Sequence, residues 1–267
     1  MSAHAYGWNA QRPDHRDRYF DLEEPVLRAH QLPARADLWP HVPPIWNQAA
    51  LGSCTAHGSL RGFLTEAIKQ GVSMPMLSRL MQYFDTRDVE GTTDSDSGGQ
   101  VRDAIKVLAT DGCAPESEWP YDIAKFTQRP PTQAYADAKQ YMSVKYQAVR
   151  VGGPGAPMRT ALASGLAIVF GFSVPQSFED GSWDPASEPL PLPSPDEGFI
   201  GGHCVAVTGY DFSGRTPYFI CDNSWDTGWG GTWGGEGCDG GRFALTADWF
   251  SPYLGLASDL WVVQAVR

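Results

Sequence analysis

The sequence predicts an α+β protein whose helices lie mainly in the first half of the chain and whose strands lie mainly in the second. In the first half, apolar residues recur at helical spacing, whereas the second half carries short apolar runs typical of buried strands. The 267 residues include 29 glycines and 21 prolines, so turns and loops should be frequent. These observations favour two packed halves, one helical and one built on a sheet.

The clearest helix begins near Cys54. Apolar residues from 55 to 69 fall at helical spacing, and Gly71 supplies a stop. An extended, proline-rich approach over 32–46 precedes it. Shorter helices are predicted over 77–84, 100–110, 131–140 and 158–165, and strands over 143–151, 166–172, 203–210, 216–222, 242–245 and 260–266.

Composition excludes several classes of protein. The formal charge of −11 disfavours binding to nucleic acid or anionic membranes. No apolar run approaches the roughly 20 residues of a membrane span. The first residues lack the apolar core of a signal peptide, so a cytoplasmic location is the default expectation, with a non-standard export route left open. The five cysteines form no CxxC pair, and Asp94 and Asp96 lack the spaced ligands of a calcium loop. We therefore expect neither metal nor cofactor, and we expect a monomer.

Cys54 is the first candidate for chemistry. A helix N-terminus carries partial positive charge, which favours a thiolate and lowers the pKa of a cysteine. Most single cysteines are buried small hydrophobes, so this position alone does not distinguish a nucleophile from a core residue. A nucleophile also needs a base, a group that orients the base, and donors for the oxyanion.

The chain offers one candidate for each of these roles. His203 opens a strand after two glycines and could act as the base, and Asn223 follows the next strand, where it could orient the imidazole. Gln48, six residues before Cys54, could donate its side-chain amide to the oxyanion. His57 lies one turn after Cys54, but its side chain should point along the helix surface, so we favour His203 as the base.

These motifs resemble those of the papain-like cysteine peptidases, in particular the bacterial members. His203 follows Cys54 by 149 residues and Asn223 follows His203 by 20, which is the order and spacing of that family. The run Asn-Ser-Trp-Asp-Thr-Gly-Trp-Gly from Asn223 is similar to the family's Asn-Ser-Trp-Gly-x-x-Trp-Gly. The resemblance covers the chain from about residue 32 to its end.

The resemblance implies a two-subdomain fold, with a helical left half, an antiparallel β-barrel-like right half and an active-site cleft between them. The catalytic domain would span 32–267, with a helical subdomain of about 46–140 and a β subdomain of about 141–267 plus 32–45. Residues 1–31 would form an N-terminal extension. It is too short for the family's usual inhibitory prodomain, so we expect it either to cover part of the cleft or to pack elsewhere for stability.

The resemblance also implies the activity of a cysteine endopeptidase, a thiol protease that hydrolyses peptide bonds in peptide or protein substrates through a Cys-His pair. Cys54 would attack, His203 would protonate the leaving amine, Asn223 would hold the ring, and Gln48 with the Cys54 N–H would stabilise the oxyanion. Acyl or peptidyl transfer, deamidation, or a catalytically silent binding module on the same fold remain alternatives.

Other positions follow from the resemblance. The substrate-binding loop would contain Gly98 and Gly99, and Trp225 would shield the His–Asn hydrogen bond. A substrate pocket would be bordered by Val101, Phe170 and Cys204. For Cys204, buried packing is an equal interpretation. The chain departs from the family at Leu51 and at Asp96-Ser97, where the family's paired cysteines usually lie, and at Thr55, Gly202 and Asp226. The customary disulfide of the helical half therefore cannot form.

Overall fold

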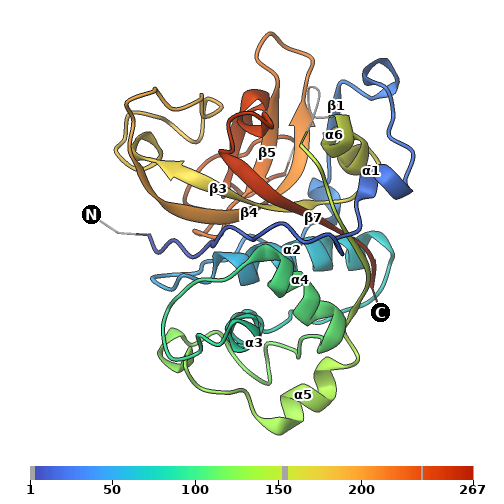
Figure 1. Ribbon diagram of the computed structural model, residues 1–267, viewed down its shortest axis with the longest axis vertical. Coiled ribbons are helices and arrows are strands. Elements are labelled where there is room, and N and C mark those ends of the chain that lie inside the picture. The colour runs from blue at the N-terminus through green and yellow to red at the C-terminus, as the bar shows by residue number, and fades with distance from the viewer. Residues whose placement is uncertain (1–3, 152–155, 236, 267) are drawn as a thin grey trace.

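The computed structural model describes residues 4–151, 156–235 and 237–266, and it confirms the α+β class. The helical half contains α2 (Cys54–Lys69), α3 (Arg79–Glu90), α4 (Val101–Thr110) and α5 (Thr132–Ala138). The other half is a sheet with α6 (Ala156–Ala163) packed beside it. Figure 1 shows α3, α4 and α5 on one side, the sheet with α6 on the other, and α2 running between them.

The sheet is antiparallel and open. Its strands are β1 (Arg35–Asp37), β2 (Ser143–Ala148), β3 (Ile168–Pro175), β4 (Phe199–Asp211), β5 (Tyr218–Asp222), β6 (Arg242–Thr246) and β7 (Ala257–Val266). They are ordered β2-β7-β3-β4-β5-β6, and β1 adds to β4. The expectation of a barrel-like half was therefore too strong, because the strands at the two ends of this order, β2 and β6, do not pair with each other to close the sheet.

Helix α2 is buried on nearly all sides, as its position between the two halves requires. Two glycines on α2 allow the sheet to approach closely. A Cβ atom on Gly58 would lie 2.9 Å from the Cys204 sulfur, and one on Gly62 would lie 2.8 Å from a methyl group of Val169. These contacts hold the helix that begins at Cys54 directly against β3 and β4.

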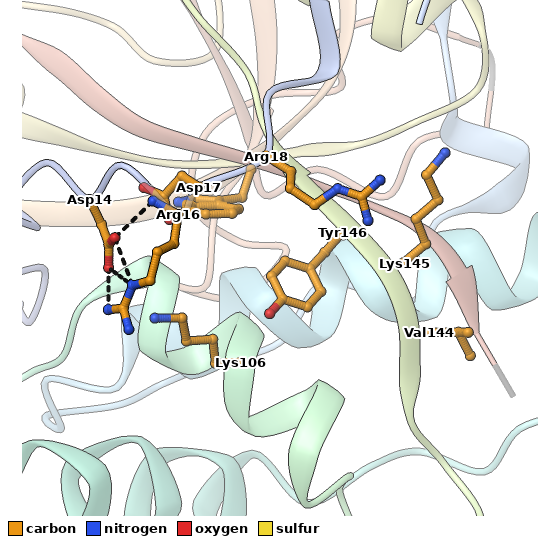
Figure 2. A pocket seen from close by; sticks show the side chains of 9 residues that line it. Asp14, Arg16, Asp17, Arg18, Lys106, Val144, Lys145 and Tyr146 are labelled. Atoms are coloured by element: carbon orange, nitrogen blue, oxygen red, sulfur yellow. Dashed lines mark hydrogen bonds and ion pairs between the residues drawn. The ribbon is translucent and has the colours of Figure 1, made fainter. Parts of the chain in front are cut away.

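The N-terminal segment has little regular structure but many contacts with the body. A short helix, α1 (Phe20–Glu23), buries Phe20 in the core of the sheet half. Before it, Asp17 forms a buried ion pair with Arg102 of α4, with a distance of 2.5 Å between Oδ2 and Nη2. Residues 14–18 also border a cavity of about 320 Å³ between α4, β2 and the segment (Figure 2). The segment is thus fastened along the junction of the two halves (Figure 1).

Among the described residues, no helix combines the length and apolar character needed to cross a membrane.

Asp85 on α3 carries a pH-dependent contribution to stability. Its side chain is buried, Tyr135 donates to Oδ1 at 2.6 Å, and Oδ2 has no partner among the described residues. Burial raises the pKa of this carboxyl to about 7; the charges of Asp111 and Asp88 act in the same direction, while Tyr135 and Arg129 oppose them. Because the folded pKa lies above the unfolded value, the free energy of unfolding should fall as pH rises from about 4 to 7.

Replacing Asp85 by asparagine should remove this penalty. We expect Asp85→Asn to raise the free energy of unfolding above that of the wild type, as measured by urea denaturation. This increase should be about 1–3 kcal/mol larger at pH 8 than at pH 4.5. Asp88→Asn, at a more exposed position on the same helix, is the control and should change stability by less than about 0.5 kcal/mol at both pH values. Equal gains at the two pH values for Asp85→Asn would contradict the prediction.

Candidate active site

Cys54 is the first residue of α2, and its side chain is fully buried. Burial raises the pKa of its thiol, and the nearby backbone N–H groups of Cys204, Gly7 in the N-terminal segment and Thr55 act in the opposite direction. Since Cys204 is the neighbour of His203, the sulfur lies beside the strand that carries the predicted base. The structure thus brings the helix start and the beginning of β4 together.

His203 and Asn223 are joined by a hydrogen bond of 2.7 Å between Nε2 and Oδ1. The amide oxygen can only accept, so the imidazole proton is on Nε2 and the lone pair is on Nδ1. Within the described chain, Nδ1 has no hydrogen-bond partner. Trp225 stacks on the imidazole with 4.9 Å between ring centroids.

Gln48 is held by three hydrogen bonds in a fully buried position. Its Oε1 accepts from Ser224 Oγ at 2.6 Å, and its Nε2 donates to the carbonyl of Leu51 at 2.8 Å and to that of Ala5 at 2.9 Å. The bond to Ser224 orients the amide so that its NH₂ group faces the cysteine loop. A peptide carbonyl, that of Ala5, therefore already lies where we expect an oxyanion to form.

Residues 4–9 occupy the space above these side chains. The Trp8 N–H donates to the Gly202 carbonyl at 2.9 Å, the Gly99 N–H donates to the Gly7 carbonyl at 2.8 Å, and the Asn9 N–H donates to the Gly99 carbonyl at 3.0 Å. These bonds place Trp8 and Gly99 in a parallel β-bridge. The segment is thus bound as an added strand between the loop at 98–99 and the start of β4.

The side chains of this segment fill the neighbouring surface. His4 stacks on Trp225 with 3.7 Å between centroids, and Tyr6 meets His203 edge to face at 5.9 Å. Glu179 accepts hydrogen bonds from both the Tyr6 hydroxyl and the His4 ring. Cys54 and His203 have no solvent-exposed surface.

Burial under the segment favours the uncharged forms of both groups. Burial raises the pKa of the Cys54 thiol to about 11, and the surrounding N–H groups offset only part of this increase. Burial likewise lowers the pKa of the His203 imidazole to about 4, although the hydrogen bond to Asn223 acts in the opposite direction. In this covered state the cysteine is a thiol and the histidine is neutral at pH 7.

The predicted substrate-binding residues divide into two groups. Gly98, Gly99 and Trp225 contact the N-terminal segment directly. Val101 is buried in the core cluster against which Trp8 packs, whereas Phe170 lies in the core of the sheet half and Cys204 packs against α2. The structure does not bring Phe170 to the surface that the segment occupies, because its ring packs against Phe172 and Phe250.

Three residues outside the predicted site surround the Trp8 indole. A Cβ atom on Gly171 would lie 2.0 Å from the indole ring, and one on Gly202 would lie 2.7 Å from it. The indole N–H donates to Asp259 Oδ2 at 3.0 Å. Gly202 was noted only as a departure from the family pattern. Gly171 lies within a predicted strand and carries no local signal, and Asp259 is brought here by β7, so neither could be found from spacing.

His57 lies outside this constellation. Its ring is buried against Trp46 and Tyr121, and Nδ1 lies 3.0 Å from the Ser53 carbonyl. Burial lowers the pKa of this imidazole to about 3, so the ring is neutral and acts as a packing group.

Asp96 joins two loops of the helical half where the family's disulfide would lie. Its carboxylate accepts from the Gly52 N–H at 3.0 Å and from the Tyr83 hydroxyl. The five cysteines are free thiols. Hydrogen bonds to the Asp96 carboxylate thus link the cysteine loop to the loop that contains Gly98 and Gly99 without a disulfide.

The chain belongs to the papain family of cysteine proteases, because the model of that family matches residues 31–237. It is therefore a hydrolase of the peptidase class. The chain is 33% identical over 285 aligned positions to an uncharacterized peptidase C1-like protein of Acanthamoeba polyphaga mimivirus, with 98% of this chain and 87% of the relative covered.

Solved structures agree with this assignment. Xylellain, a cysteine protease from Xylella fastidiosa, matches with a TM-score of 0.82 and 31% identity over 99% of this chain and 97% of that structure. Bromelain from Ananas comosus, solved in complex with the E64 inhibitor, matches in fold with a TM-score of 0.64 and 20% identity over 88% of this chain and 100% of that structure.

Proposed function

We propose that the protein is a cysteine endopeptidase in which Cys54 and His203 form the reactive pair. The proposal is carried by the hydrogen bond between His203 Nε2 and Asn223 Oδ1, which leaves Nδ1 free for proton exchange beside a cysteine at a helix N-terminus. The substrate is a peptide or protein, the enzyme acts as a monomer, and no metal or cofactor takes part.

Each residue has a defined step in this mechanism. The Cys54 thiolate attacks the peptide carbonyl carbon, the C–N bond breaks, and His203 protonates the leaving amine. Water then attacks the acyl-enzyme, His203 accepts its proton, and the acid product leaves with the thiolate restored. Asn223 holds the ring in one tautomer throughout.

Gln48 and the Cys54 N–H form the oxyanion hole of this proposal. The hydrogen bond from Gln48 Nε2 to the Ala5 carbonyl supports this role, because it is made to a peptide oxygen above the nucleophile. Transfer of the acyl group to an amine, deamidation and a silent binding role would use the same groups, and no contact in the described residues favours any of them over hydrolysis.

We also propose that residues 1–31 are a regulatory extension of a catalytic domain spanning 32–267, and that residues 4–9 block the cleft. The backbone hydrogen bonds of residues 7–9 to Gly99 and Gly202 hold the segment beside the Cys54–His203 pair, and both of these residues are fully buried. The segment therefore keeps substrates away from the pair and favours its uncharged form. The first three residues lie outside the described part of the chain.

Labelling with an epoxide inhibitor of the E64 type tests the proposed nucleophile. Intact-mass analysis of the full chain and of a chain that begins at residue 12 should give one adduct, lost in Cys54→Ala and retained in the control Cys113→Ala. The shorter chain should react faster because its cleft is open. Labelling of a different cysteine, or no adduct in the shorter chain, would refute the proposal.

A further inference from the structure

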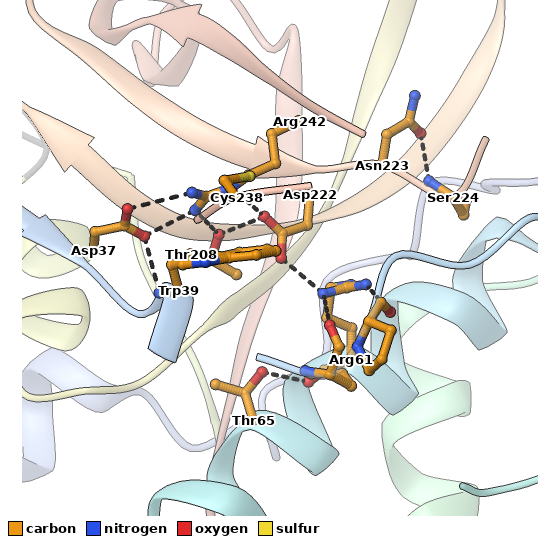
Figure 3. A network of polar contacts seen from close by, with 12 residues as sticks. Asp37, Trp39, Arg61, Thr65, Thr208, Asp222, Asn223, Ser224, Cys238 and Arg242 are labelled. Atoms are coloured by element: carbon orange, nitrogen blue, oxygen red, sulfur yellow. Dashed lines mark hydrogen bonds and ion pairs between the residues drawn. The ribbon is translucent and has the colours of Figure 1, made fainter. Parts of the chain in front are cut away.

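Four charged side chains form one cluster of ion pairs (Figure 3). Asp222 Oδ2 accepts from Arg61 Nη1 at 2.8 Å, and Asp222 Oδ1 accepts from Arg242 Nε at 2.8 Å. Arg242 also pairs with Asp37 at 2.9 Å. The side chains of Asp222 and Arg242 are fully buried and that of Arg61 is 3% exposed, whereas that of Asp37 is 21% exposed at the edge of the cluster.

The cluster connects the two halves of the molecule at the elements that carry the reactive groups. Arg61 lies on α2, seven residues after Cys54 and therefore on the same face of that helix. Asp222 ends β5 and directly precedes Asn223. Thr208 of β4, the strand of His203, donates to Asp222 Oδ1 at 2.7 Å. The Asp222 carboxylate, which β5 carries, is thus bonded to Arg61 on the helix of Cys54 and to Thr208 on the strand of His203.

Arg61 extends this connection to the oxyanion loop. Its guanidinium donates to the carbonyls of Pro43 and Pro44 at 2.9 and 2.7 Å, and it lies over the Trp46 ring at 5.1 Å. Trp46 in turn accepts from the Asp226 N–H at 3.0 Å, just beyond Asn223 and Trp225. The segment leading to Gln48 is therefore fastened to the same ion pair.

We propose that Arg61 and Asp222 are positioning residues that set the placement of Cys54 relative to His203; this inference rests on the proposed peptidase function. A thiolate and an imidazolium stabilise each other only when they are close, since their attraction falls with distance. The hydrogen-bonded ion pair fixes the spacing between the two halves, because breaking it leaves a buried charge without a partner.

The test measures the rate of Cys54 alkylation by iodoacetamide in the full chain at pH 6 and pH 9. Iodoacetamide reaches Cys54 only in those molecules whose N-terminal segment has left the cleft. In these molecules a thiolate paired with imidazolium stays reactive at pH 6, whereas an isolated thiol loses most of its thiolate form there. We divide the rate of Cys54 alkylation at pH 6 by the rate at pH 9. This ratio reports how strongly the His203 imidazolium stabilises the Cys54 thiolate. The other titratable groups near the pair are His4 and Tyr6 on the segment, His57 on α2 and Cys204 on β4, and they are the same in all variants.

Arg61→Met should lower this ratio by at least about tenfold, whereas Arg61→Lys, which can still reach Asp222 with a charge, should stay within about threefold of the wild type. Glu116→Gln is the matched control. Its ion pair with Arg79 lies within the helical half, so its loss should lower the melting temperature and leave the ratio unchanged. If Arg61→Met does not fold, Thr208→Val takes its place, because it removes one hydrogen bond from Asp222 and keeps both ion pairs; a fall of about threefold is then expected.

An unchanged ratio in Arg61→Met, or in Thr208→Val when it is needed, would overturn the positioning role while leaving the proposed function intact. Absence of alkylation at Cys54 in the wild type at both pH values would overturn both.

Discussion

A chain that begins at residue 12 should hydrolyse a fluorogenic peptide about 10²-fold faster than the full chain at low substrate concentration. The deletion removes the backbone bonds of residues 7–9, the Ala5 carbonyl that Gln48 binds and the Trp8 side chain. Burial of an aromatic side chain contributes about 1.5–3 kcal/mol and each hydrogen bond about 0.5–1.5 kcal/mol. After the cost of ordering the segment, a closed state favoured by about 3 kcal/mol would keep roughly one molecule in a hundred open.

Two full-length variants separate the cleft contacts from the rest of the extension. Trp8→Ala should activate part of the way, since it leaves the backbone bonds intact but removes the indole between Gly171, Gly202 and Asp259. His15→Ala changes a side chain that is 95% exposed and should leave turnover unchanged. Equal kcat/KM for the full and shortened chains, with both folded by circular dichroism, would show that the segment does not inhibit.

Gln48→Ala should reduce kcat by about 10²–10³-fold when it is measured in the chain that begins at residue 12, because one oxyanion donor is lost. In the full chain the same change also removes the bond to Ala5, so the segment should dissociate more readily and the epoxide should gain access faster. Steady-state kinetics and intact-mass labelling measure the two effects separately.

Gln82→Ala provides the control for loss of a buried glutamine. Gln82 lies on α3 and donates to the Ala104 carbonyl at 2.8 Å, inside the helical half. Its replacement should lower stability and leave kcat within about twofold of the parent. A similar fall in kcat for the two variants would mean that Gln48 acts through folding alone and not through the oxyanion.

Much of the site could be predicted from the chain because its parts depend on local pattern and spacing. The helical period after Cys54 predicted a helix that begins at the cysteine, and α2 does begin there. The apolar runs around His203 and before Asn223 predicted two strands, and β4 and β5 pair with Ala206 opposite Asp222. This pairing brings His203 and Asn223 within hydrogen-bond distance of each other.

Other features depend on contacts between residues far apart in sequence. The open sheet follows from which strands pair, and β1 was expected only as an extended approach because three residues carry too little pattern to predict a strand. Phe170 was expected beside the substrate, but its ring packs against Phe172 and Phe250 in the core of the sheet half. When both faces of a strand are buried, its residues are apolar throughout and do not alternate with polar ones. The sequence therefore does not show which face of the strand meets the cleft.

The sequence by itself determined that Cys54 begins a helix and that a histidine, an asparagine and a glutamine follow the order of a cysteine peptidase. Only the tertiary structure decided that residues 4–9 lie across this site and that Arg61 and Asp222 join its two halves. The physical reason is that helix starts and strand periods are encoded by neighbouring residues, whereas the path of an aperiodic segment and the pairing of buried charges depend on the surface that the whole fold creates.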